Sequence, residues 1–232
     1  MARATNAADL AANFAHSVAA FQTYSNGEPF YETGRKPLKT PQEIPAEIRR
    51  TEDFAAILRA QRNGCVENDA SLNFRYVERE IVPARTTGGV QYDNGDRPSR
   101  WIRLDLLLAG ELPILGELKL RNDNASAYYG LIQLLASASE MATAPQHARL
   151  LRYYSSHLPI LGLPRYDLYL IFYRSNPHSK PKMEILDETR RLTSQLVAFP
   201  EISKYVGRIV ALDADWTERA KITFRKRFGY SA

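Results

Sequence analysis

Apolar and polar residues alternate in two adjacent segments near the middle of the chain, between positions 101 and 121. Alternation with a period of two predicts half-buried β-strands. In the first segment the apolar face consists of Ile102, Leu104, Leu106 and Leu108. In the second segment it consists of Ile114, Gly116, Leu118 and Leu120. We therefore expect an antiparallel hairpin in which each strand has one apolar and one charged face.

The charged faces of these strands hold both carboxylates and cations. If the connection has three residues, pairing places Asp105 opposite Glu117 and Arg103 opposite Lys119, with Arg121 further along the same side. An even-numbered loop without a bulge would break this arrangement. Like charges that face each other repel, so the cluster would be costly without a ligand. Its oxygen donors and its ammonium group suit Mg²⁺ and a phosphate.

Helical and strand-like patterns surround the hairpin and predict the fold class. Helices are expected over 2–24, 45–62, 125–142 with a continuation to 155, and 187–205, and strands over 71–82, 166–173 and 208–212. A helix between the second hairpin strand and the strand over 166–173 is a crossover that suits parallel neighbours in one sheet. The expected fold is α/β, with a central mixed β-sheet flanked by helices.

The same patterns divide the chain into three parts. Residues 1–44 are expected to form a helix and a loop that contains Pro and Gly, and residues 45–213 an α/β domain. Residues 214–232 are expected to form a basic, aromatic C-terminal tail. Basic residues interleaved with aromatics suit nucleic acid, but a terminal segment that packs its aromatics and exposes its charges has the same composition.

Composition argues against several classes of protein. The lone Cys65 cannot form an internal disulfide, and the four histidines show no metal-ligand spacing, so a zinc site or a Ser-His-Asp hydrolase has little support. The longest apolar runs are too short to span a membrane, and the N-terminus lacks the apolar core of a secretory signal. We expect a protein of the cytoplasm with no membrane partner.

A formal net charge of +5 favours binding to polyanions. The segment over 83–100 is too long for a tight turn and leads directly into the first hairpin strand. The arginines in and beside these segments are candidates for contacts with nucleic-acid phosphates: Arg85, Arg97, Arg100, Arg103 and Arg121.

Asp105, followed on the next strand by Glu117-Leu118-Lys119, resembles the motif of the PD-(D/E)XK nuclease superfamily. The resemblance implies a restriction-endonuclease-like fold with an αβββαβ core. It also implies that Asp105, Glu117 and the Leu118 carbonyl bind Mg²⁺, or Mn²⁺ in its place, while Lys119 positions or activates the attacking water. Leu104 stands where the family often has a proline.

Two further residues follow from the same resemblance. Members often place a glutamate of the preceding helix near the metal, which points to Glu52 here. The RecB-like branch has a glutamine on the following helix, which Gln133 matches, and a tyrosine one turn later. This sequence has Ser137 at that place and Tyr129 one turn earlier, so the full branch motif is not present.

The expected function is hydrolysis of phosphodiester bonds, most readily those of DNA, by a Mg²⁺-dependent endonuclease or related nuclease. Many such enzymes dimerise to cut two strands, and a homodimer is compatible with this chain. The alternative is a nucleic-acid-binding or assembly module that uses the same fold without catalysis. A third class is an α/β domain with a salt-bridged sheet face, because Asp and Glu-x-Lys at this spacing also occur in unrelated strands.

Overall fold

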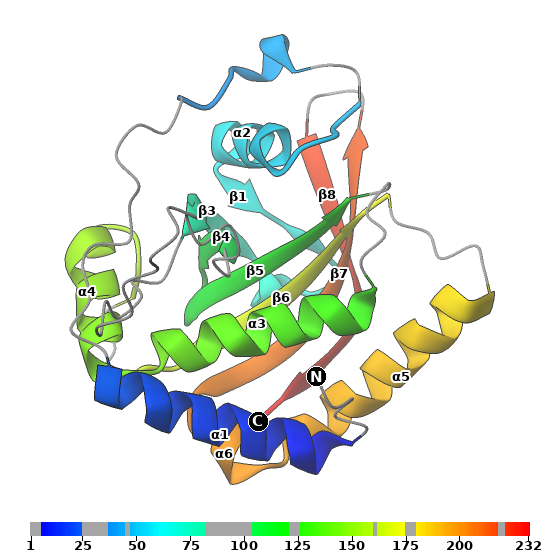
Figure 1. The fold of residues 1–232 in the computed structure, drawn as a ribbon. Helices are drawn as coiled ribbons and strands as arrows, with labels where there is room; N and C mark the ends of the chain where they lie inside the picture. The colour runs from blue at the N-terminus through cyan, green and yellow to red at the C-terminus, as the bar shows by residue number, and fades with distance from the viewer. Residues whose placement is uncertain are drawn as a thin grey trace, which may run out of the picture.

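A strongly curved eight-stranded sheet organises the computed structural model (Figure 1). The structure describes residues 6–24, 37–44, 47–81, 104–120, 126–159, 162–174, 180–217 and 221–232. The strands are β1 (Asn63–Gly64), β2 (Val66–Glu67), β3 (Phe74–Ile81), β4 (Leu104–Ala109), β5 (Pro113–Leu120), β6 (Tyr166–Tyr173), β7 (Val206–Thr217) and β8 (Lys221–Ser231). Their order in the sheet is β1-β3-β4-β5-β6-β7-β8-β2. Because β1 and β2 are consecutive in sequence, the segment 63–67 connects the two ends of the sheet.

Both strand directions occur in this sheet. β3, β4 and β5 form an antiparallel meander, while β5, β6 and β7 are parallel. β8 returns antiparallel to β7, and β2 pairs parallel to β8. The segment expected to be a C-terminal tail therefore contains a full strand of the central sheet.

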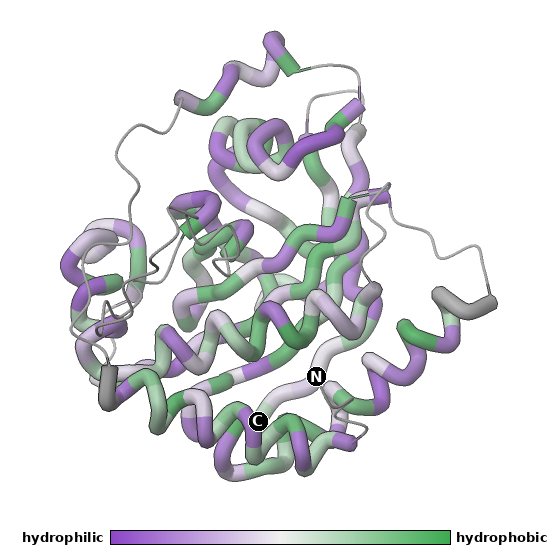
Figure 2. The backbone as a smooth tube through the Cα atoms, viewed as in Figure 1, coloured by the Kyte–Doolittle hydropathy of each residue, from purple (hydrophilic) through white to green (hydrophobic). Residues whose placement is uncertain are grey.

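Six α-helices lie on the two faces of the sheet within the described residues (Figure 1). They are α1 (Ala7–Tyr24), α2 (Thr51–Gln61), α3 (Ala127–Met141), α4 (Ala144–Tyr154), α5 (Lys180–Leu196) and α6 (Pro200–Ser203), and short 3₁₀ turns cover Pro41–Glu43 and Ala70–Leu72. α1 packs with α3, α5 and α6 on one face, whereas α2 packs on the other. Figure 2 shows hydrophobic residues along the central strands and an alternation of hydrophobic and hydrophilic residues along the helices.

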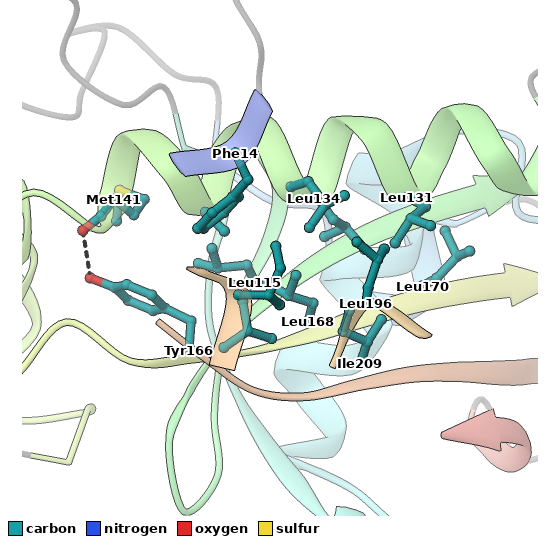
Figure 3. Close-up of a cluster of buried hydrophobic side chains, with 14 of the residues drawn as sticks. Phe14, Leu115, Leu131, Leu134, Met141, Tyr166, Leu168, Leu170, Leu196 and Ile209 are labelled. Atoms are coloured by element: carbon teal, nitrogen blue, oxygen red, sulfur yellow. Dashed lines mark hydrogen bonds between the residues drawn. The ribbon is translucent and has the colours of Figure 1, made fainter. Parts of the chain in front are cut away.

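The α3-side core fills the space between α3, α1, α5 and the sheet (Figure 3). Leu131 and Leu134 of α3 pack here with Leu115 and Leu168 of the sheet. The hydroxyl of Tyr166, the first residue of β6, donates a hydrogen bond to the Met141 carbonyl at the end of α3, at 2.9 Å. Burial raises the pKa of Tyr166, so its hydroxyl stays protonated and able to donate. This bond fixes the end of α3 to the start of β6.

The α2-side core is rich in aromatic rings. Phe54 of α2 meets Phe224 of β8 edge to face, with ring centroids 6.3 Å apart, and Phe74 of β3 lies 4.9 Å from the same ring. Full burial of each such side chain contributes about 1.5–3 kcal/mol. The rings join α2 to strands from both ends of the sheet and so stabilise its curvature.

Several expectations about the fold are confirmed. The chain is an α/β protein with a mixed sheet flanked by helices, and β4 and β5 are joined by the three residues 110–112. Other boundaries were wrong. α5 begins at Lys180 rather than near 187, because a proline is tolerated in the first helical turn, where Pro181 lies. β7 extends to Thr217, because pairing with β8 compensates the poor strand propensity of its aspartates.

Among the described residues, no helix combines the length and the apolar character needed to cross a bilayer.

Candidate active site

Glu117 and Lys119 form a buried ion pair on the face of β5 that meets α3. Lys119 Nζ donates hydrogen bonds to Glu117 Oε1 at 2.8 Å and to Gln133 Oε1 of α3 at 2.9 Å. Glu117 is 3% exposed and Lys119 is 4% exposed. Strand alternation places both side chains on one face, and the docking of α3 brings Gln133 to them. The ammonium group is therefore held by groups from two different elements.

Asp105 lies at the neighbouring position of β4. The β4–β5 pairing runs from Ala109 with Pro113 to Leu106 with Gly116, and Asp105 and Glu117 are the next residues on the two strands. The carboxylate of Asp105 accepts a hydrogen bond from the backbone N–H of Leu118, with 2.9 Å between N and Oδ2. The two strands thus place both carboxylates at one end of the hairpin, as the three-residue connection predicts.

Gly130 allows α3 to approach β5 closely. A Cβ at this position would lie 2.9 Å from Lys119 Cε and 2.6 Å from Leu170 Cδ1, both too short for real contacts. One turn earlier, Ser126 caps the helix and its hydroxyl accepts a hydrogen bond from the N–H of Tyr129 at 3.2 Å. The absence of a side chain at 130 lets Gln133 reach Lys119.

Tyr129 is the exposed neighbour of this cluster. Lys119 Nζ lies 5.4 Å from the centre of the Tyr129 ring, within the range of a cation–π contact. The Tyr129 residue is 55% exposed, so about half of it is accessible to solvent. The aromatic side chain thus links the buried ion pair to the protein surface.

A buried ion pair has a high cost in desolvation free energy. Removing each charge from water costs several kcal/mol, and well-packed apolar residues often stabilise a protein at least as well. Glu117 and Lys119 offset this cost by pairing with each other and through Gln133. Since stability alone gives little reason for such a pair, its place between sheet and helix points to function.

The metal-binding capacity of the site rests on two side-chain carboxylates and one backbone oxygen. Asp105, Glu117 and the Leu118 carbonyl supply oxygen donors, the ligand type that Mg²⁺ prefers. Within the described parts of the chain, no group of three or more His, Cys, Asp or Glu side chains is arranged to hold a metal ion. Mg²⁺ here would therefore keep several waters, as it does at many protein sites.

Glu52 lies on a different side of the sheet from Lys119 and Gln133. It forms an ion pair with Arg79 of β3 at 3.6 Å. Arg79 pairs with Leu106, whose side chain belongs to the α2-side core. Lys119 and Gln133 instead meet on the α3 face. The five arginines expected to contact nucleic acid, Arg85, Arg97, Arg100, Arg103 and Arg121, lie outside the described residues.

Glu80 of β3 is a residue that the sequence interpretation did not select. It lies between Arg79, which pairs with Leu106, and Ile81, which pairs with Leu104, and so stands beside Asp105 in the sheet. Its φ is 48°, a value uncommon for a non-glycine residue and frequent at functional sites. Its carboxylate accepts a hydrogen bond from Arg79 Nη1 at 3.0 Å. Along β3 the apolar residues change from one face of the strand to the other, and this change is the local sequence signal of the irregularity.

No protein-family model, curated protein or solved structure matches the chain in comparisons with known proteins.

Proposed function

We propose that this protein is a metal-dependent nuclease that hydrolyses phosphodiester bonds, with DNA as the favoured substrate. The observation that carries the proposal is the convergence of Asp105, Glu117, Lys119 and Gln133 from two strands and one helix. Two carboxylates, an ammonium group and an amide on rigid elements match the groups that metal-assisted phosphate hydrolysis needs.

The order of elements supports the same proposal. After α2 and the two-residue strands β1 and β2 come the antiparallel strands β3, β4 and β5, then α3 and α4, and then β6 parallel to β5. This is the order expected for the αβββαβ core of the PD-(D/E)XK superfamily, with α4 as an addition. The candidate residues lie on the second and third strands of that order, where the motif belongs.

Each residue has a distinct role in this proposal. A bound Mg²⁺ would lower the pKa of a water and offset charge on the reacting phosphate. Asp105 and Glu117 supply the negative charge that attracts the cation. Lys119 stabilises the negative charge that develops on the phosphate, and Gln133 holds its ammonium group in place.

Cleavage assays with a lysine variant test the proposal. Purified protein is mixed with linear, circular and single-stranded DNA and with RNA, in Mg²⁺, Mn²⁺ or EDTA. Lys119→Ala should reduce the cleavage rate by about 10²-fold or more, the usual effect of losing such a group. Lys204→Ala is the matched control, because Lys204 also lies over a tyrosine ring, at 5.0 Å, but on the surface beyond α6. Cleavage that survives Lys119→Ala, or no cleavage under any condition, contradicts the proposal.

A nucleic-acid-binding or assembly module is the second candidate, and one observation favours it. Lys119 Nζ occupies Glu117 Oε1, an oxygen that a metal would use. A protein that kept this pair closed would bind nucleic acid without cutting it. Binding of the same DNA and RNA, measured with and without Mg²⁺ and unaccompanied by cleavage, would support the module.

A further inference from the structure

A row of paired residues leads from Lys119 across the sheet to its last strand. Lys119 pairs with Phe172, Phe172 with Asp213, Asp213 with Arg225, and Arg225 with Glu67. Residues that pair across neighbouring strands place their side chains on the same face. Asp213, Arg225 and Glu67 therefore lie on the same face as the candidate active site.

The members of this row beyond Lys119 line a pocket of about 300 Å³. Its lining includes Phe172, Arg174, Asp213, Asp215, Arg225 and Arg227. The volume lies at the lower end of the range for small-molecule sites. Since Phe172 pairs directly with Lys119, the pocket begins one strand away from the candidate catalytic lysine.

The charges in the pocket are balanced. Arg174 Nε lies 2.6 Å from Asp215 Oδ1, Arg227 forms a bidentate ion pair with Asp213, and Arg225 Nε lies 3.9 Å from Glu67 Oε2. The Arg227 guanidinium also stacks over the Phe172 ring, 4.9 Å from its centre. Such a site suits a ligand that carries an anion together with hydrogen-bond donors.

We propose that this pocket binds one nucleotide of the strand that is cut beside Lys119, an inference that rests on the proposed function. A nucleotide carries a phosphate for an arginine and a base edge with both donors and acceptors, which match the mixed charges. Lys119 on β5 and Arg225 on β8 are three strand spacings apart, about 14 Å. A phosphate bound at Arg225 is therefore not the reacting phosphate but one a few nucleotides along the same strand.

Arg225 is the phosphate-binding residue of this pocket. Its side chain is 75% exposed, and its distance to Glu67 is close to the limit of an ion pair. Arg174 and Arg227 are held more tightly by their aspartates, and they form the walls. Among the basic residues of β8, the proposal assigns phosphate binding to Arg225 alone.

The test measures DNA binding by the full chain in EDTA. Arg225→Ala should raise the dissociation constant for a labelled oligonucleotide about tenfold, as expected for the loss of a charge-assisted hydrogen bond. The slope of log K against log salt should become less steep by about 0.7–0.9, the value of one phosphate contact. Arg191→Ala is the matched control, because Arg191 on α5 is also paired, with Glu188, and its side chain is 48% exposed.

A second measurement locates the contacted phosphate. Oligonucleotides with a single neutral methylphosphonate are scanned along the strand. Neutralising one phosphate a few nucleotides from the cut should weaken binding to the wild type and have no further effect on Arg225→Ala. Equal binding by wild type and Arg225→Ala, or an equal loss in Arg191→Ala, overturns the pocket assignment.

The two proposals can fail separately. Cleavage that depends on Lys119, together with binding that does not depend on Arg225, would overturn only the pocket. Binding that depends on Arg225 by a wild-type protein that cuts nothing would overturn the hydrolase and retain the pocket.

Discussion

Gly130 lies directly against Lys119, so that a Cβ at position 130 would come within 2.9 Å of the lysine Cε. The same added atom would lie 3.6 Å from Glu117 Cγ. A glycine in the first half of α3 costs helix stability relative to alanine, by about 0.5–1 kcal/mol. At this position the cost is offset by the close approach that lets Gln133 hold Lys119.

Gly130→Ala should therefore displace the candidate catalytic lysine. We expect a loss of about 1–3 kcal/mol in the free energy of unfolding, the usual cost of overpacking, together with a fall in cleavage rate. Urea unfolding and initial cleavage rates measure the two effects. Gly162→Ala is the control, because no atom lies within 4 Å of an added Cβ there. If Gly130→Ala is as stable and active as Gly162→Ala, the close packing of α3 on Lys119 is not important.

Tyr129→Ala should weaken nucleic-acid binding. Stacking of a base on an aromatic ring contributes about 1–3 kcal/mol, so we expect a loss of about fivefold or more in affinity for single-stranded DNA. Tyr153 of α4 provides the matched control, because it is 42% exposed and has Arg152 5.5 Å from its ring centre. Fluorescence anisotropy measures the affinity of each variant for DNA. An identical affinity of Tyr129→Ala and Tyr153→Ala would exclude stacking at Tyr129.

Mg²⁺ should stabilise the wild type through Asp105 and Glu117. A ligand at 100 times its dissociation constant adds about 2.7 kcal/mol to the free energy of unfolding. Asp105→Asn should remove most of this gain, because it deletes one of the two carboxylate charges. Thermal unfolding with Mg²⁺ and with EDTA measures the difference, and Glu188→Gln on α5 controls for the loss of a surface charge. A Mg²⁺-induced rise in Tm that persists in Asp105→Asn argues against this metal site.

Asp167 should make the stability depend on pH. Burial raises the pKa of this carboxyl to about 6 from 3.8, although Arg208 Nε lies 2.7 Å from its Oδ2 and opposes the rise. Its Oδ1 has no hydrogen-bond partner among the described residues, and the side chain is almost fully buried. The folded state therefore binds this proton more tightly than the unfolded state does. The stabilising contribution is fully present below about pH 4 and is lost as the pH rises through 6.

The size of this effect follows from the two pKa values. A difference of about two units between the folded and unfolded pKa values of Asp167 corresponds to about 3 kcal/mol in the free energy of unfolding. The free energy of unfolding should fall between pH 4 and pH 7 in the wild type. The fall should be about 3 kcal/mol larger than any fall in Asp167→Asn. Chemical denaturation at the two pH values measures it, and comparing the two changes cancels any cost of the substitution that is independent of pH. Parallel pH profiles for the two proteins would show that Asp167 is already ionised at pH 4.

Local sequence patterns were sufficient for the hairpin and for the two carboxylates on it. A three-residue connection sets the register of β4 and β5, so Asp105 and Glu117 come to the same end of the hairpin. The expected alternation fails at Leu104, which packs in the α3-side core, whereas Leu106 packs in the α2-side core. The helix that contains Gln133 was also predictable from its periodic apolar residues, and the structure places its N-cap at Ser126. These features depend on residues that are close together in the chain.

The sequence by itself determined the α/β class and the hairpin that contains Asp105, Glu117 and Lys119, because short-range alternation and turns depend on neighbouring residues. Only the tertiary structure decided that Gln133 holds Lys119 and that Glu52 pairs with Arg79 on the other side of the sheet. It also decided that β8 closes against β7 and places Arg225 in a row with Lys119. Those contacts depend on the curvature of the sheet and on side-chain packing between distant elements, which no local pattern encodes.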